Sequence, residues 1–404
     1  MTTLPPDTET DRSARTAHLA GFDGLRALAA FLVLVHHASF PSARMYTGHF
    51  AHQFTQLDIG VAIFFLLSGF LLFRPFVERS LDDTPGPNWR AYAWRRAARI
   101  FPAYWLALGT MIVVGKLTHD RLLGLPRYPT SLAGYLPYFG LVHVYRNLHE
   151  ATGGINQAWT LAVEITFYVF LPIWAAAMAR VCRGRSASDR VSLHLIGLVV
   201  LFGAGIAFRA WCSWGSVRVL HEVGEYWLPA NLDLFALGMA LAVLSVAAAR
   251  GIGYGFLAAR AGRLGLAWWL VACALFWWSA TKLPVGITDR PTHLAGIFKQ
   301  ESHGLIAFCL LLPVVFAPTG SWLVHRLLEH RALVFGGTVS YGVYLWHQAW
   351  IIQGTRWSYT PPLHTSMPLL VAFALGASTA TAAVSWFAVE RPVIRWAARR
   401  SSTR

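Results

Sequence analysis

Long apolar runs recur along the chain and constrain its fold more than any other feature of the sequence. A run of about 20 mostly apolar residues is long enough to cross the hydrocarbon core of a bilayer as an α-helix. The composition agrees, because 55% of the 404 residues are hydrophobic and only 13% are charged. We therefore expect an all-α integral membrane protein, a bundle of about ten transmembrane helices. The apolar runs lie near residues 22–40, 57–73, 100–116, 158–179, 193–211, 229–249, 264–282, 302–318, 336–354 and 367–388.

The basic residues predict how this bundle is oriented. Most of them fall in alternate loops between the runs, and loops rich in Arg stay in the cytoplasm. This bias predicts a multi-pass protein of the cell (plasma) membrane with both termini in the cytoplasm. A shorter apolar run covers residues 131–146. If this run crossed the membrane, the Arg-rich loop at 180–190 would lie outside the cell. We therefore predict that 131–146 is a re-entrant or surface element.

One large membrane domain with two polar ends is the expected organisation. Residues 1–20 are polar and lack a signal-peptide pattern, which predicts a disordered cytoplasmic tail. Residues 21–390 are expected to form the transmembrane domain, and 391–404 a basic cytoplasmic tail. The net charge of +15 does not indicate nucleic-acid binding, because the basic residues are spread between apolar runs. The four cysteines lack metal-ligand spacing, so neither a metal site nor a disulfide framework is expected.

An arginine and a histidine lie within the first apolar run. Ionisable side chains in lipid-spanning segments usually face a protein interior or a water-filled cavity, so they are functional candidates. Arg26 and His37 are eleven positions apart, which is almost three helical turns and a rise of about 16 Å. Both side chains therefore share one helical face. The alternative is a snorkelling arginine and an interfacial histidine.

Two further arginines precede the third run. Arg96 and Arg99 are three residues apart, so they are neighbours on one face of a helix at its cytoplasmic end. Guanidinium forks suit the recognition of phosphate and pyrophosphate. Ordinary positive-inside anchoring is the alternative interpretation.

Acidic residues lie at membrane depth in three of the runs. Glu164 is one to two turns below the outer surface in the run 158–179, where a carboxylate needs a partner or a proton. Asp58 opens the second run, and Asp233 lies at a depth similar to that of Glu164. Ser68 and Gly69, deeper in the second run, are interpreted as small residues that permit close helix packing.

The ninth run carries two tyrosines at helical spacing, Tyr341 and Tyr344, and then His347 in its outer half. A lone histidine there is more often a satisfied core residue. Here, however, several polar groups map to the outer half of one bundle. The candidates to line a pore or an acceptor site are Asp58, Asp233, Tyr341, Tyr344 and His347.

These motifs resemble the acyltransferase 3 family of multipass membrane acyltransferases. The matching stretches are residues 23–26 with His37, 58–70, 96–102, 159–164, 340–347 and 390–392. The resemblance implies ten core helices and transfer of an acyl group, commonly acetyl from acetyl-CoA, to a hydroxyl on a sugar. The acceptor would be an envelope polysaccharide, a glycolipid or a glycosylated metabolite.

The implied partners are the lipid bilayer, acyl-CoA and the sugar-containing acceptor. Acyl-CoA, most simply acetyl-CoA, enters as a co-substrate, and no bound cofactor is expected. The oligomeric state is left open. The alanine-rich, arginine-rich composition resembles that of actinobacterial proteins, which favours a bacterial source.

The residues and the resemblance together predict a mechanism. CoA phosphates would bind Arg96 and Arg99, and the pantetheine arm would pass Arg26 toward His37. Neutral His37 would act as general base on the acceptor hydroxyl, with Glu164 or another carboxylate orienting its ring. Arg26 is a second catalytic candidate, polarising the thioester oxygen. Whether a covalent acyl-enzyme forms is left open.

The competing class is a permease or flippase for a glycolipid or small solute. Its polar groups at the membrane midplane would bind and pass the solute. Such folds often carry inverted repeats, with helices broken by Gly or Pro in matching halves. Neither pattern is evident in this sequence, so we favour the enzyme.

Overall fold

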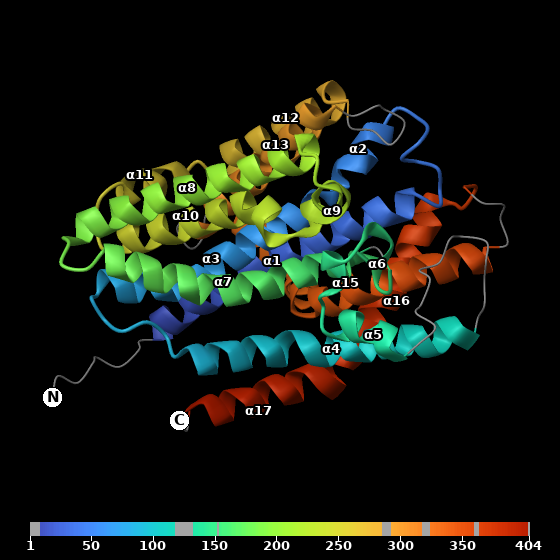
Figure 1. Ribbon diagram of the computed structural model, residues 1–404, viewed down its shortest axis with the longest axis horizontal. Coiled ribbons are helices and arrows are strands. Elements are labelled where there is room, and N and C mark those ends of the chain that lie inside the picture. The colour runs from blue at the N-terminus through green and yellow to red at the C-terminus, as the bar shows by residue number, and fades with distance from the viewer. Residues whose placement is uncertain are drawn as a thin grey trace.

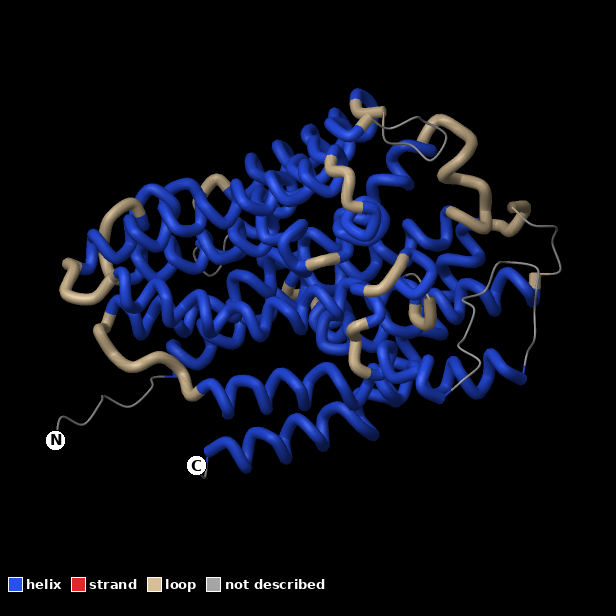
Figure 2. The backbone as a smooth tube through the Cα atoms, in the orientation of Figure 1, coloured by secondary structure: helices blue, strands red, loops and turns tan. Residues whose placement is uncertain are grey.

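The computed structural model describes residues 9–117, 132–151, 153–284, 292–316, 324–358 and 363–402. These residues are mostly helical, and no strand occurs among them. Figure 1 shows the long helices running roughly parallel to the longest axis of the molecule, and Figure 2 shows the loops that join them at their ends. The all-α fold expected from the apolar runs is confirmed for the described residues.

Each of the ten apolar runs overlaps a long helix. These helices are α1 (Glu9–Ser39), α3 (Ile59–Leu81), α4 (Trp89–Leu117), α7 (Trp159–Val181), α8 (Ala187–Trp214), α10 (Leu232–Ala249), α12 (Gly265–Lys282), α13 (His293–Phe316), α15 (Arg331–Trp357) and α16 (Met367–Ser385). Shorter helices connect them or continue them: α2 (Ala51–Thr55), η1 (Gln56–Asp58), α5 (Leu132–Phe139), η2 (His143–Tyr145), α6 (Leu148–Ala151), η3 (Asn156–Ala158), α9 (Arg218–Val223), η4 (Gly224–Tyr226), η5 (Leu228–Asn231), α11 (Gly255–Gly262), α14 (Val324–Leu328), the π-helical η6 (Trp386–Glu390) and α17 (Arg391–Ser402).

Fewer than ten helices qualify as membrane spans by length and composition alone. Within the described residues six helical stretches do so, and the pair α11 and α12, which meet at 82°, makes a seventh if it is one span. The long helices α1, α13 and α15 are not among them. Each carries polar residues within its apolar sequence, among them Arg26, Lys299 and His347. The count of about ten crossings therefore stays a prediction.

The segment 131–146 contains only short helices in its described part. The helix α5 has 8 residues and contains Pro137, so it is about 12 Å long. A bilayer core is about 30 Å thick. This length agrees with the prediction that 131–146 does not cross the membrane.

Helices extend into both predicted tails. The helix α1 begins at Glu9, inside the segment 1–20 for which the sequence predicts disorder, and residues 1–8 lie outside the described residues. At the other end, α17 occupies most of the predicted basic tail and runs beside α4 (Figure 1). The rings of Trp94 and Trp396, from these two helices, lie 5.5 Å apart.

Close helix packing holds α1 against its neighbours. A Cβ atom added at Gly337 of α15 would overlap the backbone of Asp23, and one added at Gly60 of α3 would overlap the carbonyl oxygen of Ala29. Glycine at these positions therefore lets the helices touch backbone to backbone. As a consequence α3 and α15 both lie directly beside α1, the helix that carries Arg26 and His37.

Candidate functional site

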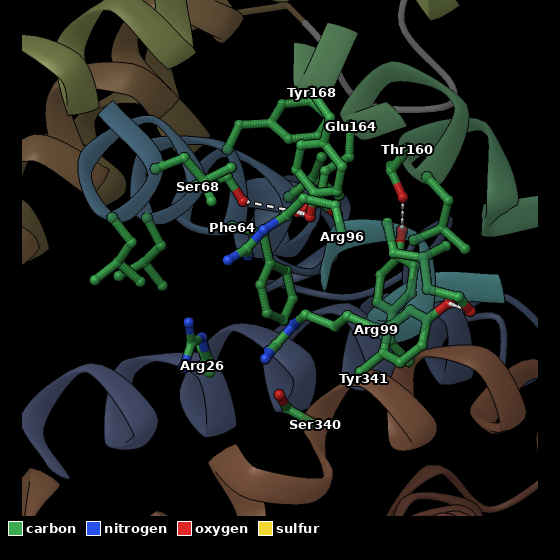
Figure 3. Close-up of a pocket in the computed structure, with 18 residues that line it drawn as sticks. Arg26, Phe64, Ser68, Arg96, Arg99, Thr160, Glu164, Tyr168, Ser340 and Tyr341 are labelled. Carbon is green, nitrogen blue, oxygen red and sulfur yellow. Dashed lines mark hydrogen bonds between the residues drawn. The ribbon is translucent and has the colours of Figure 1, made fainter. Parts of the chain in front are cut away.

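A pocket opens into the bundle between five of the long helices. It encloses about 890 Å³ of empty space, including its open mouth, and is lined by α1, α3, α4, α7 and α15 (Figure 3). Its walls combine apolar side chains with a small set of polar ones, as is typical of ligand sites. The polar lining residues are Arg26, Ser68, Arg96, Arg99, Thr160, Glu164, Tyr168, Ser340, Tyr341 and Tyr344.

Three arginines make the pocket cationic. Arg26 comes from α1, and Arg96 and Arg99 come from α4. Figure 3 shows their guanidinium groups pointing into the same space. Glu164 is the only carboxylate among the described lining residues, so the pocket carries an excess of positive charge. The structure therefore brings together the three arginines that the sequence singles out for donor binding.

Aromatic rings and a nearby carboxylate hold two of these arginines. The Arg96 guanidinium lies 5.8 Å from the ring centre of Tyr92 and 5.9 Å from that of Tyr168, within the range of cation–π attraction. Its buried Nε has no hydrogen-bond partner in the described chain. Arg26 Nη1 donates to Asp23 Oδ1 at 2.7 Å, one turn earlier on α1. Each arginine thus keeps donors available to a bound anion.

Glu164 is anchored by two hydroxyl groups. Its Oε1 accepts a hydrogen bond from Ser68 Oγ at 2.9 Å and another from Tyr168 OH at 2.6 Å. Ser68, interpreted as a packing residue from the sequence, therefore also binds Glu164. Gly69 does pack closely, because an added Cβ would overlap the Phe235 carbonyl oxygen.

The two tyrosines of α15 line the same pocket as the three arginines, and their predicted role in a pore or an acceptor site stays a prediction. Tyr341 OH donates to the carbonyl oxygen of Ile100 at 2.9 Å, which ties α15 to α4 next to Arg99. Tyr344 OH lies 2.8 Å from Thr160 Oγ1 on α7. These bonds fix the hydroxyl groups to the walls of the pocket, so the rings form its surface.

His37 lies beside the pocket without lining it. Its Nδ1 is 3.0 Å from the carbonyl oxygen of Val33 and 3.0 Å from Nε2 of His347. The His347 side chain is buried and its ring centre lies 5.8 Å from that of Tyr344. The histidine pair therefore adjoins the wall of the pocket that Tyr344 forms. From the sequence we expect a carboxylate such as Glu164 beside His37, whereas the structure places an imidazole there.

Asp58 lies outside the pocket, paired with α13. Its Oδ2 accepts a hydrogen bond from Lys299 Nζ at 2.7 Å, and its Oδ1 lies 3.9 Å from Nδ1 of His303. The side chains of Asp58 and Lys299 are 37% and 21% exposed, so the pair is only partly buried. The sequence does show that Lys299 and His303 share a face of one helix, but nothing in it connects that face to Asp58.

Asp233 is also absent from the pocket. Its fully buried side chain accepts a hydrogen bond from Arg209 Nη2 at 2.8 Å, and Arg209 Nη1 lies 3.5 Å from Glu301 Oε1. These residues join α8, α10 and α13 in one buried ion cluster. Asp233 thus makes a buried contact between helices away from the pocket, and its predicted role in lining a pore or an acceptor site stays a prediction.

No site for a metal ion emerges from the described ranges, which contain no group of three or more His, Cys, Asp or Glu side chains placed to hold one.

Comparison with known proteins defines the class. The sequence profile of the acyltransferase domain family matches residues 19–388, and the chain therefore belongs to this family. It is an acyltransferase built as a helical membrane bundle. No solved structure matches the chain.

Three bacterial relatives illustrate the range of the family. YrhL of Bacillus subtilis, provisionally named a peptidoglycan O-acetyltransferase, is 26% identical over 351 residues, which are 84% of this chain and 49% of YrhL. The exopolysaccharide production protein ExoZ of Rhizobium meliloti is 26% identical over 372 residues, 85% of this chain and 92% of ExoZ. Nodulation protein 10 of Rhizobium leguminosarum is 25% identical over 408 residues, 94% of each chain. The chain thus spans about half of YrhL but nearly all of the other two.

Proposed function

We propose that this protein transfers an acyl group, most simply acetyl, from acyl-CoA to a hydroxyl of a sugar-containing acceptor. The observation that carries the proposal is the convergence of Arg26, Arg96 and Arg99 in one pocket, one wall of which adjoins the His37–His347 pair. Family membership supports acyl transfer. The names of YrhL and ExoZ support a sugar polymer of the cell envelope as acceptor.

Acyl-CoA fits the charge and the length of this arrangement. CoA carries a pyrophosphate and a 3′-phosphate, and guanidinium groups bind such oxygens with paired hydrogen bonds. Arg26 and His37 lie on one face of α1, about 16 Å apart along the helix. Phosphates held by the arginines would leave the extended pantetheine arm to carry the thioester toward His37.

His37 then acts as the general base. It takes the proton of the acceptor hydroxyl while the hydroxyl oxygen attacks the thioester carbon. The new ester forms, the carbon–sulfur bond breaks, and the proton passes from His37 to the departing CoA thiolate. Arg26 binds the donor together with Arg96 and Arg99, about 16 Å along α1 from His37, so it does not contact a thioester that lies beside His37. Glu164, fixed by Ser68 and Tyr168, helps to set the arginine side chains around the donor.

The two substrates approach from opposite sides of the membrane. With ten crossings and both termini in the cytoplasm, the arginine pocket faces the side on which acyl-CoA is made. The partly exposed pair of Asp58 and Lys299 then lies toward the outer side, where its charges bind acceptor hydroxyl groups. The acceptor is an envelope polysaccharide, a glycolipid or a glycosylated metabolite.

Purified protein in lipid nanodiscs, incubated with acetyl-CoA labelled in the acetyl group, tests the proposal. We expect release of free CoA that depends on an added polysaccharide or glycolipid acceptor, with the label recovered in an alkali-labile ester. A permease or flippase would move its solute without consuming acetyl-CoA. Absence of acceptor-dependent CoA release across peptidoglycan, exopolysaccharide and glycolipid acceptors would overturn the proposal.

A further inference from the structure

We propose that His347 is a positioning residue for His37: it fixes the tautomer of the His37 ring and shares the positive charge that forms during transfer. This inference rests on the proposed role of His37 as general base. It replaces the carboxylate expected beside His37 with a second imidazole, the Nε2 atom of which lies 3.0 Å from His37 Nδ1.

The hydrogen bonds of His347 determine where its proton lies. Its Nδ1 is 2.8 Å from the carbonyl oxygen of Tyr344 and 3.2 Å from that of Val343. A carbonyl oxygen only accepts, so Nδ1 carries the proton and donates it. In a neutral imidazole the other nitrogen is then unprotonated. The Nε2 atom of His347 therefore faces His37 as an acceptor.

The same reasoning fixes the tautomer of His37. Its Nδ1 faces two acceptors, Nε2 of His347 and the carbonyl oxygen of Val33. An unprotonated nitrogen at this position would face two lone pairs, so Nδ1 carries the proton. The Nε2 atom of neutral His37 then holds the free lone pair, and it makes no hydrogen bond to the described part of the chain. This is the nitrogen that can take a proton from the acceptor hydroxyl.

A buried amide holds His347 in place. Gln157, which is 3% exposed, donates its Nε2 to the carbonyl oxygens of Tyr344 at 2.9 Å and Leu345 at 3.0 Å. The Tyr344 carbonyl thus accepts from both Gln157 and His347. Tyr344 OH in turn donates to the Gln157 carbonyl oxygen at 3.2 Å. The chain of bonds from Gln157 through Tyr344 to His347 limits rotation of the His347 ring, and hence of His37.

The pair also accommodates the transferred proton. When His37 Nε2 takes the hydroxyl proton, the resulting imidazolium still donates Nδ1–H to Nε2 of His347. The hydrogen bond becomes charge-assisted and stronger. Unlike a carboxylate partner, His347 does this without placing a negative charge beside His37. The proton on Nε2 then goes to the CoA thiolate, which returns both rings to their neutral tautomers. No proton is gained or lost by the pair over one cycle.

Two substitutions separate this role from simple packing. His347→Ala removes the acceptor, and we expect kcat to fall by about 10- to 100-fold while KM for acetyl-CoA stays within about twofold. His347→Gln should recover part of the loss, because its amide oxygen can accept from His37 Nδ1–H. His194→Ala is the matched control, since His194 is also buried but bonds to Ser80, and neither residue lines the pocket. Unchanged kcat in His347→Ala, or a loss confined to KM, would overturn the inference.

A measurement independent of activity completes the test. In protein labelled with ¹⁵N-histidine, the His37 resonances, assigned by their absence in His37→Gln, should show a protonated Nδ1 and an unprotonated Nε2. In His347→Ala the Val33 carbonyl oxygen alone remains to hold Nδ1–H, so the same labelling should show a larger fraction of the tautomer protonated on Nε2. A protonated Nε2 on His37 in the unmodified protein would refute the assignment, whereas a lack of acyl transfer with the expected tautomer would count against the proposed function alone.

Discussion

Lys299 Nζ donates a hydrogen bond to Asp58 Oδ2 at 2.7 Å, which joins α13 to the start of α3. If this pair contacts the acceptor, Asp58→Asn should raise KM for the acceptor and leave KM for acyl-CoA unchanged. The exchange Asp58→Lys with Lys299→Asp keeps an ion pair but reverses its direction, so it should restore thermal stability without restoring acceptor binding. Equal recovery of thermal stability and of acceptor binding in the exchanged variant would show that the pair is purely structural.

The arginine pocket should determine donor affinity. A hydrogen bond to a charged group is worth roughly 1.5–3 kcal/mol, so replacing both Arg96 and Arg99 with Ala should weaken acyl-CoA binding by about 100-fold or more. Lys at both positions should restore the charge but only part of the affinity, because lysine lacks the planar fork. Binding is measured by calorimetry on protein in nanodiscs.

Arg95 provides the control for this double variant. It lies in the same basic stretch of α4 but does not line the pocket, so Arg95→Ala should leave acyl-CoA affinity near that of the wild type. Unchanged affinity in the Arg96 and Arg99 double variant would reduce the two arginines to topology signals.

The ion cluster around Arg209 should matter for stability rather than for catalysis. Removing one partner of a buried ion pair typically costs about 3–5 kcal/mol, so Asp233→Ala should lower the free energy of unfolding by roughly that amount. Arg218→Ala, which removes the exposed pair with Glu222, should leave the free energy of unfolding close to that of the wild type. Denaturant titration in mild detergent measures both. Equal stability of the two variants would contradict the structural role of the cluster.

Reporter fusions test the orientation on which the mechanism depends. Fusions after Glu150, Arg185 and Arg404 should report outside, inside and inside, because the Arg-rich loop at 180–190 is expected in the cytoplasm. An outside signal at Arg185 would mean that 131–146 crosses the membrane. The side of the membrane that the arginine pocket is proposed to face would then have to be reassigned.

The three arginines of the pocket were predictable candidates because they are few, charged and placed at helical spacing within apolar sequence. Arg26 stands out as a cation inside a membrane run, and the interval between Arg96 and Arg99 puts both on one face of α4. Such signals are local, since charge at membrane depth and a period of 3.6 residues can be read from a single stretch of chain.

The partners of these residues were not predictable, because they are joined only by packing. Glu164 meets Ser68 across 96 positions, and His37 meets His347 across 310. The length of each run predicts a helix but gives no information about its neighbours. Asp233 shows the consequence: its depth resembles that of Glu164, yet Arg209 on the adjacent α8 places it in a separate buried cluster.

In the proposed reaction His37 is the general base. A general base typically contributes about 10²- to 10⁴-fold to the rate and little to ground-state binding of the donor. His36 lies about 100° around α1 from His37 and its Nδ1 faces the Phe54 carbonyl oxygen. The most direct test is therefore the rate of acceptor-dependent CoA release by His37→Ala and His36→Ala. We expect the first to lose about 10²-fold or more with acyl-CoA binding intact, and the second to stay near wild type. Near-normal transfer by His37→Ala, or loss of transfer in His36→Ala alone, would contradict the role of His37 as general base.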